Sequence, residues 1–131
     1  MPYGDRATVQ KLLAMDTWAV VGLSDDPSRA AWGVARFLQS RGKRIVPVHP
    51  RAETVHGEPG YARLADIPFD VDVVDLFVRS ELAGPVVDEA VDKGAAGVWM
   101  QLGVVDAAAA VRAEAAGLLV VMDRCPKLEP W

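Results

Sequence analysis

The sequence predicts an α/β protein, a Rossmann-like fold with a five-stranded, mostly parallel sheet and helices on both of its faces. Two observations predict this class. Five short apolar runs rich in valine alternate with segments whose apolar residues recur at helical spacing. The first run leads through a glycine and a short polar loop into an amphipathic helix, at residues 20–38, as in nucleotide-binding folds. Because 131 residues suffice for one proper core, residues 1–131 are predicted to form a single domain.

The predicted helices are recognised by apolar residues three or four positions apart and by the residues at their ends. Val9, Leu12 and Leu13 have this spacing, and Thr8 before them is the expected N-cap. Glycines follow each of the other three helices and provide their stops. The helices are expected over residues 8–15, over about 30–41 before Gly42, from Ser80 to Gly94, and from Val104 to Gly117.

The predicted strands are continuous apolar runs, which are typical of strands buried on both faces of a parallel sheet. Between the second and third strands, residues 49–68 are dense in proline and glycine. They predict an irregular connection with at most a short strand or one helical turn. In chain order, the strands are expected at residues 17–23, 44–48, 71–78, 97–102 and 118–122.

The alternation of strands with helices of about 10 to 14 residues predicts right-handed crossovers and a parallel sheet. With strands numbered along the chain, we expect the order 3-2-1-4-5. Ligands of such sheets bind beyond the carboxyl ends of the strands, where the strand order reverses. The ligand is therefore expected just after the strands, at residues 22–29, 48–51, 78–80, 101–103 and 123–126.

The loop after the first strand carries residues suited to a phosphate group. Gly22 lets the backbone approach a phosphate, although a tight turn alone would also need it. The Ser24 hydroxyl can donate to a phosphate oxygen or bond to nearby backbone. Ser28 is the expected cap of the next helix, whose free amides and dipole favour an anion. Arg29 can grip a phosphate with two parallel bonds, or lie solvated on the surface.

The middle of the same loop is less suited to an anion. Pro27 stiffens the loop and removes one backbone donor. Asp25 and Asp26 are expected to face solvent, because their carboxylates would repel a phosphate lying across the loop.

The end of the second strand discriminates between nucleotide ligands. NAD enzymes usually place Asp or Glu there to hold the ribose hydroxyls, whereas this chain has Val48, His49, Pro50 and Arg51. One cation and no carboxylate suit a ribose that carries an extra phosphate. Two such ligands are NADP, with a 2′-phosphate, and coenzyme A (CoA), with a 3′-phosphate. His49 is alternatively a packed loop histidine.

Three segments, "VVGLSDDPSRAAWGVARFLQSRGKRIVPVHP", "VWMQLGV" and "MDRCPK", resemble the small single-domain CoA-binding proteins. These are similar to the CoA-binding domain of succinyl-CoA synthetase alpha subunits and of ADP-forming acyl-CoA synthetases. The resemblance runs from about residue 12 to 130. It implies that CoA is bound by Gly22, Leu23, Ser24 and Pro27, by Val48, Pro50 and Arg51, by Val78 and Arg79, by Met100, Gln101 and Leu102, and by Cys125 and Pro126.

Two positions depart from the pattern of these relatives. They favour Asn-Pro after the second strand, where this chain has His49 and Pro50, and they often have Ser at the helix start, where this chain has Ala31. The departures bear on specific hydrogen bonds and not on the fold.

No catalytic set is expected in this chain. The only histidines, His49 and His56, lie in the same connection without a third metal ligand. Cys125 and His49 follow different strands, with no evident orienting acid. A synthetase of the resembled type needs a phosphorylated histidine on a second domain. The prediction is therefore a non-catalytic binding, carrier or regulatory module for CoA or acyl-CoA. The alternatives are an NADP-binding redox or regulatory protein, and a CoA-binding subunit whose chemistry lies on another chain.

Composition narrows the possible partners. A net charge of −4 argues against nucleic acid. The start of the chain has no apolar core for a signal peptide, and no apolar run approaches the roughly 20 residues that cross a membrane. A single cysteine, Cys125, excludes an internal disulfide and a cysteine-built metal site and fits a reducing cytosol, so a cytoplasmic protein is predicted.

Cys125 follows the fifth strand and is expected at the ligand edge of the sheet. It is either a small turn cysteine or a thiol close to the thiol end of CoA. Arg124 and Lys127 flank it in sequence, and nearby cations favour a thiolate. In the second case a mixed disulfide with CoA is expected under oxidation.

Overall fold

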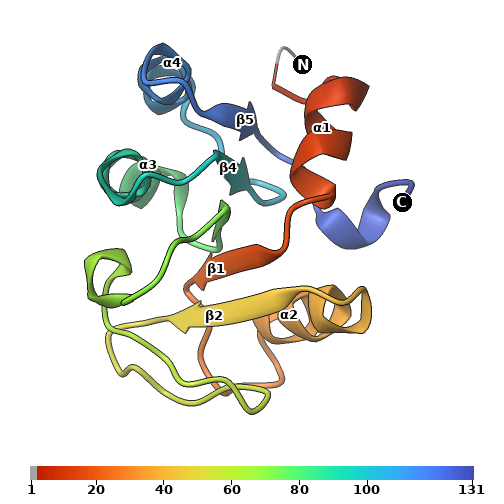
Figure 1. The fold of residues 1–131 in the computed structure, drawn as a ribbon, viewed down its shortest axis with the longest axis vertical. Helices are drawn as coiled ribbons and strands as arrows, with labels where there is room; N and C mark the ends of the chain where they lie inside the picture. Colours follow the sequence, from red (N-terminus) through yellow and green to blue (C-terminus); the bar gives the residue numbers. More distant parts are fainter. Residues whose placement is uncertain (1–2) are drawn as a thin grey trace.

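A computed structural model describes residues 3–131 as one parallel five-stranded sheet between two layers of helices (Figure 1). Helices α3 and α4 lie on one side of the sheet, and α1 and α2 lie on the other. All four strand pairs are parallel. The strands are β1 (Thr17–Val21), β2 (Arg44–Val48), β3 (Val73–Leu76), β4 (Gly97–Met100) and β5 (Leu119–Val121), and the helices are α1 (Arg6–Leu13), α2 (Ala30–Ser40), α3 (Ser80–Lys93) and α4 (Ala107–Ala115).

The predicted fold class and its alternation of elements are confirmed. The connection from β2 to β3 contains one 3-10 turn, η1 (Leu64–Asp66), and a second turn, η2 (Pro126–Leu128), follows β5. The predicted cap of α1 was wrong, because Asp5 caps this helix by accepting the Thr8 N–H at 3.0 Å. Thr8 lies inside the first turn, where its hydroxyl donates to the same carboxylate.

The predicted strand order 3-2-1-4-5 was wrong, since the sheet has the order β2-β1-β3-β4-β5. Pro47 supplies the physical reason. Proline has no N–H to donate and is confined to edge strands, and the expected order would have paired β2 on both sides. In the observed sheet, Pro47 turns its carbonyl outward to accept the Tyr61 N–H at 3.0 Å. β3, which is buried along its whole length, takes the central place beside β1. The strand order therefore reverses between β1 and β3.

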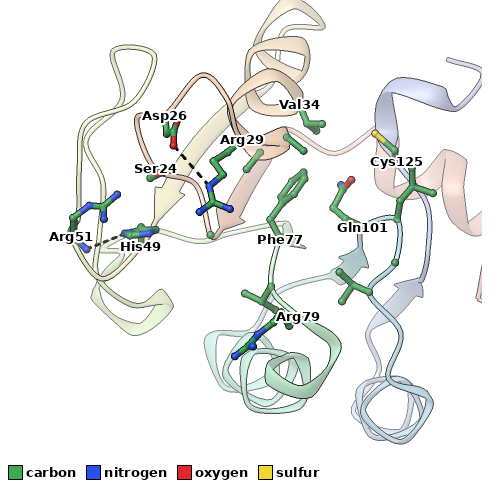
Figure 2. Close-up of a pocket in the computed structure, with 17 residues that line it drawn as sticks. Ser24, Asp26, Arg29, Val34, His49, Arg51, Phe77, Arg79, Gln101 and Cys125 are labelled. Atoms are coloured by element: carbon green, nitrogen blue, oxygen red, sulfur yellow. Dashed lines mark hydrogen bonds and ion pairs between the residues drawn. The ribbon is translucent and has the colours of Figure 1, made fainter.

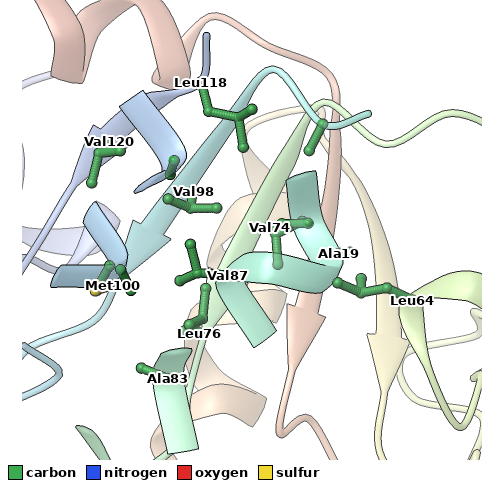
Figure 3. Close-up of a cluster of buried hydrophobic side chains, with 14 of the residues drawn as sticks. Ala19, Leu64, Val74, Leu76, Ala83, Val87, Val98, Met100, Leu118 and Val120 are labelled. Atoms are coloured by element: carbon green, nitrogen blue, oxygen red, sulfur yellow. The ribbon is translucent and has the colours of Figure 1, made fainter. Parts of the chain in front are cut away.

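Side chains alternate between two hydrophobic layers, one on each face of the sheet. The layer below α3 and α4 contains Val74, Leu76, Val98 and Met100 (Figure 3). The opposite layer, below α1 and α2, is built around Trp18 and Trp99, whose ring centroids are 5.6 Å apart. Each strand is thus anchored on both faces, and its carboxyl end is fixed for the loops that follow.

Among the described residues, no helix has both the length and the apolar character that a membrane span requires.

Candidate functional site

A pocket of about 690 Å³ opens at the carboxyl ends of β1, β3 and β4, where the strand order reverses (Figure 2). Its walls come from the loop after β1, the first turns of α2, and the loops that follow β2, β3, β4 and β5. The predicted residues that line it are Gly22, Ser24, Arg29, His49, Arg51, Val78, Arg79, Gln101, Leu102 and Cys125. All five predicted loops contribute to this one pocket, as the rule for parallel sheets predicts.

The other predicted residues lie close to the pocket without lining it. Leu23 and Met100 are fully buried in the core, and Val48 and Pro126 are also buried. Pro27, Ser28 and Pro50 are exposed. Ser28 does not cap α2 with its side chain, which was the expectation. Its hydroxyl donates to Asp26 at 2.7 Å, and Arg29 is the N-cap residue without a side-chain bond.

Several lining residues were missed by the sequence reasoning. Ala31 and Val34 face the pocket from α2. Phe77, directly after β3, and Val104, in the loop after β4, also line it. Ala31 and Val34 had a usable signal, because they follow the predicted phosphate loop at helical spacing on the inner side of α2.

Gly22 has a structural reason to be glycine. Its φ is +96°, and a Cβ there would lie 2.3 Å from the Phe77 carbonyl oxygen. Its N–H donates to the Val48 carbonyl at 2.8 Å. The tight-turn explanation therefore holds, and it is compatible with a backbone that also borders the pocket.

Three arginines stand around the outer part of the pocket, which we call the rim: Arg29, Arg51 and Arg79. Their side chains are 74%, 63% and 77% exposed, and each pairs with an acidic neighbour at 3.9 Å, 3.3 Å and 3.9 Å. Exposed ion pairs contribute little to stability. These guanidinium groups are therefore available to exchange a neighbouring carboxylate for a ligand phosphate.

Asp26 does not simply face solvent, as expected, because it lines the pocket. Hydrogen bonds from the Ser28 hydroxyl and N–H, and the nearby Arg29, hold the pKa of Asp26 below its usual value. Asp25 is exposed as predicted, and it accepts the Trp32 indole N–H at 3.2 Å. An ionised Asp26 repels an anion at this part of the rim, so Arg29 can bind a phosphate only by giving up its ion pair with Asp26.

The loop after β2 is tied to α2 and so has a fixed position. The His56 ring nitrogen Nε2 lies 2.8 Å from the Trp32 carbonyl oxygen, and the two rings stack edge to face. Gln39 donates to the His56 carbonyl at 3.1 Å. At the start of the loop, His49 Nδ1 accepts the Arg51 N–H at 3.2 Å. These contacts hold the loop against α2 and fix the backbone of Arg51, whose side chain lines the pocket.

The inner end of the pocket has a different character (Figure 2). Gln101 and Cys125 lie there, with 4% and 9% of their surface exposed. Gln101 Nε2 donates to Asp75 Oδ1 at 2.6 Å. Asp75 is completely buried within β3, and burial raises the pKa of its carboxyl to about 8. At neutral pH this group is therefore mainly a neutral carboxylic acid.

Asp75 was missed by the sequence reasoning although it had a signal. It is an acidic residue inside "VDVVDLFV", a run interpreted as a strand buried on both faces. Acidic residues are almost never fully buried without a partner. An acid at that position indicates either a break in the strand or a special site, and the structure shows an unbroken strand.

Of the two interpretations of Cys125, a small turn cysteine or a reactive thiolate beside the ligand thiol, the thiolate character was wrong. Burial raises the pKa of its thiol and is the largest effect; the backbone N–H of Lys127 lowers the pKa by less, and the nearby Asp75 raises it again. Arg124, the other flanking cation, pairs with Glu129 at 3.1 Å. Cys125 is thus a neutral thiol at the inner end of the pocket.

Neither histidine belongs to a metal-type cluster in the part of the chain that the structure describes, where no three His, Cys, Asp or Glu residues converge. The pocket is best described by its gradient: arginines around the rim, and apolar groups with an amide and a thiol at the inner end.

The chain matches the family model described as "CoA binding domain" over residues 16–130. It is 36% identical over 110 residues, 84% of this chain and 82% of the relative, to the uncharacterized protein YneT of Bacillus subtilis. It is 32% identical over 81 residues, 61% of this chain, to the alpha subunit of an ADP-forming acetate–CoA ligase of Pyrococcus furiosus, of which it spans only 18%. A solved structure of a hypothetical protein from Pyrococcus horikoshii superposes with a TM-score of 0.86 at 36% identity, covering 92% of this chain and 85% of that one.

Proposed function

Since the chain belongs to the family of CoA binding domains, we propose that it binds coenzyme A or acyl-CoA in the pocket between β1, β3 and β4. The protein would then serve as a binding, carrier or regulatory module for this ligand. The single unpaired cysteine is in keeping with a cytoplasmic site of action.

The gradient of the pocket is the observation that carries this proposal. CoA has a nucleotide with a pyrophosphate and a 3′-phosphate at one end and a thiol at the other. The rim offers three exposed guanidinium groups, and the inner end offers Gln101, Cys125 and apolar walls. One orientation of the ligand therefore satisfies both ends, with the phosphates outward and the pantetheine arm inward.

Each part of the pocket has a role in this proposal. The loop from Gly22 to Arg29 and the start of α2 take the pyrophosphate, with the Ser24 hydroxyl as a donor. Arg51 takes the 3′-phosphate, and His49 holds its backbone in place. Gln101 and Leu102 border the pantetheine arm, and Cys125 lies near its thiol.

We propose no chemistry for this chain alone. Cys125 is kept as a neutral thiol, and both histidines already contact backbone groups of the loop after β2 and of α2. A catalytic role shared with a second chain is the alternative suggested by the likeness to a ligase alpha subunit. Co-purification with a larger chain of the ligase type would support it.

A thermal-shift series tests the ligand. The melting temperature is measured with four ligands added separately: CoA, acetyl-CoA, NADP and NAD. A ligand present at about 100 times its dissociation constant adds about 2.7 kcal/mol to the free energy of unfolding. CoA is expected to give the largest shift. The other candidate ligand, NADP, is favoured only by the basic end of β2. A shift with NADP and none with CoA would replace the proposal with an NADP-binding protein.

A further inference from the structure

Asp75 lies in the middle of the sheet, where charged groups are normally absent. In the register of the strands it stands between Val20 of β1 and Trp99 of β4, both of which belong to the layer below α1 and α2. It has no exposed surface. A carboxyl in this position loses its hydration completely and needs hydrogen bonds to compensate.

Only one of the two carboxyl oxygens of Asp75 has a hydrogen-bond partner among the described residues. Oδ1 accepts from Gln101 at 2.6 Å, whereas Oδ2 has no hydrogen-bond partner among the residues that the structure describes. Leaving a buried polar atom unsatisfied is costly, and an apolar residue of the same shape would avoid that cost. A group that lowers stability in this way is typical of functional sites.

Gln101 connects this buried acid to the pocket. Its backbone N–H donates to the Leu76 carbonyl, which fixes the residue at the end of β4. Its side chain borders the pocket beside Cys125 (Figure 2). A free glutamine amide can rotate and present either its oxygen or its nitrogen. With Nε2 held by Asp75, the oxygen and the second N–H are left for the pocket, in a fixed arrangement.

We propose that Asp75 is a positioning residue that fixes the Gln101 amide, so that the inner end of the pocket recognises an amide group of the ligand's arm. The inference rests on the proposed function, because the pantetheine arm of CoA carries two secondary amides. It predicts that the arm, and not only the phosphates, determines affinity. A ligand with a plain alkyl arm would leave the Gln101 amide unpaired and would bind more weakly.

Two ligands separate this inference from the proposed function. CoA carries the arm, whereas adenosine 3′,5′-bisphosphate has the same phosphorylated ribose without it. Their dissociation constants are measured by calorimetry for the wild type, Asp75→Leu and Asp75→Asn. Asp75→Leu is expected to raise the dissociation constant of CoA about tenfold. The dissociation constant of the bisphosphate should stay within about twofold of the wild-type value. The free energy of unfolding of Asp75→Leu should change little, because leucine fits the apolar site and removes the unsatisfied Oδ2, which offsets the hydrogen bond that Gln101 loses. Asp75→Asn, whose oxygen can still accept from Gln101, should restore part of the affinity.

Two further variants guard against a merely structural effect. Val73→Ala removes buried volume from the same strand and the same face, so it should lower stability while keeping the ratio of the two dissociation constants. Gln101→Leu should weaken CoA binding as much as Asp75→Leu does. The double variant should bind CoA no more weakly than either single variant, because the two residues act as a unit.

The outcomes distinguish the two ideas. If the wild type binds neither ligand, the proposed function is wrong, and this inference is wrong with it. If the wild type binds CoA but Asp75→Leu binds it equally well, only the positioning role is wrong. An equal loss for both ligands, or additive losses in the double variant, would likewise assign Asp75 a general structural effect. If Asp75→Leu does not fold, the same ratio is measured for Asp75→Asn and Gln101→Leu.

Discussion

The rim and the inner end of the pocket hold polar groups in opposite ways. At the rim, Arg29, Arg51 and Arg79 are mostly exposed and share weak ion pairs with their neighbours. At the inner end, Asp75 and Gln101 are buried and joined by a short hydrogen bond. The rim can adapt to a ligand at little cost, because water already solvates it. The inner end is preorganised, because its groups have few other arrangements.

The largest effect is expected at Gly22, which borders the pocket at the end of β1, where the loop towards Arg29 begins. Gly22→Ala places a methyl group against the Phe77 carbonyl and forces φ of +96° on a residue with a side chain. The free energy of unfolding is expected to fall by about 4 kcal/mol. Chemical denaturation measures it. Gly42→Ala is the matched control, since φ is +81° there but no atom lies within 4 Å of the added methyl, and it should cost about 1 kcal/mol. Equal losses for both variants would contradict the steric explanation.

The pH dependence of stability tests whether Asp75, at the inner end of the pocket, is protonated in the folded protein. The folded pKa of Asp75 is raised to about 8, above its unfolded value near 3.8. Between these values only the unfolded chain releases this proton, so stability falls as pH rises, by about 1.4 kcal/mol per pH unit. Between pH 5 and pH 7, the wild type should therefore lose about 3 kcal/mol relative to Asp75→Asn. Denaturation midpoints at several pH values measure this difference. Parallel curves would show that Asp75 is ionised in the folded protein.

Removing rim charges tests the outer part of the pocket. Arg29→Ala and Arg51→Ala should each weaken CoA binding about tenfold, because each removes a charge-assisted phosphate contact. The loss of affinity for dephospho-CoA should be smaller than that for CoA in Arg51→Ala, because Arg51 meets the 3′-phosphate in the proposed arrangement. Arg112→Ala is the control, since Arg112 is also half exposed and paired with an aspartate, Asp88, but lies between α3 and α4. If both rim variants bind CoA like the wild type, the phosphate assignment is wrong even though the fold is right.

The smallest effect is expected at Cys125, because its thiol stays neutral. A mixed disulfide forms when its thiolate attacks a sulfur of CoA disulfide and releases one CoA thiolate. Since burial raises the pKa of this thiol, the reaction should be slow at pH 7 and faster as pH rises. Intact mass spectrometry should then find one CoA per chain, removable by reductant and absent in Cys125→Ser. A fast reaction at pH 7 would contradict a neutral, buried thiol.

The sequence predicted most of the fold because apolar periodicity determines elements of this length. It did not predict the strand order, although Pro47 within the second strand was incompatible with a place inside the sheet. The loops of the site were predicted from one topological rule. Two failures depended on contacts between residues far apart in the sequence: the burial that keeps Cys125 protonated, and the pairing of Asp75 with Gln101 across β3 and β4. The Asp5 cap is a local contact with Thr8, three residues along the chain, and was missed because Thr8 itself was predicted to be the cap. Neighbours in sequence carry no information about the first two contacts.

The Tyr61 segment that covers β2 has a consequence for self-association. An uncovered outer strand offers its backbone to other chains and invites aggregation. Here Tyr61 donates to the Pro47 carbonyl and accepts the His49 N–H, both at 3.0 Å, and Pro47 itself has no donor to offer. At the opposite side of the sheet, Met122 donates to the Tyr3 carbonyl just beyond the short strand β5. Among the described residues, both borders of the sheet are therefore partly paired near the carboxyl ends of β2 and β5, which leaves less backbone free to add a strand from another chain.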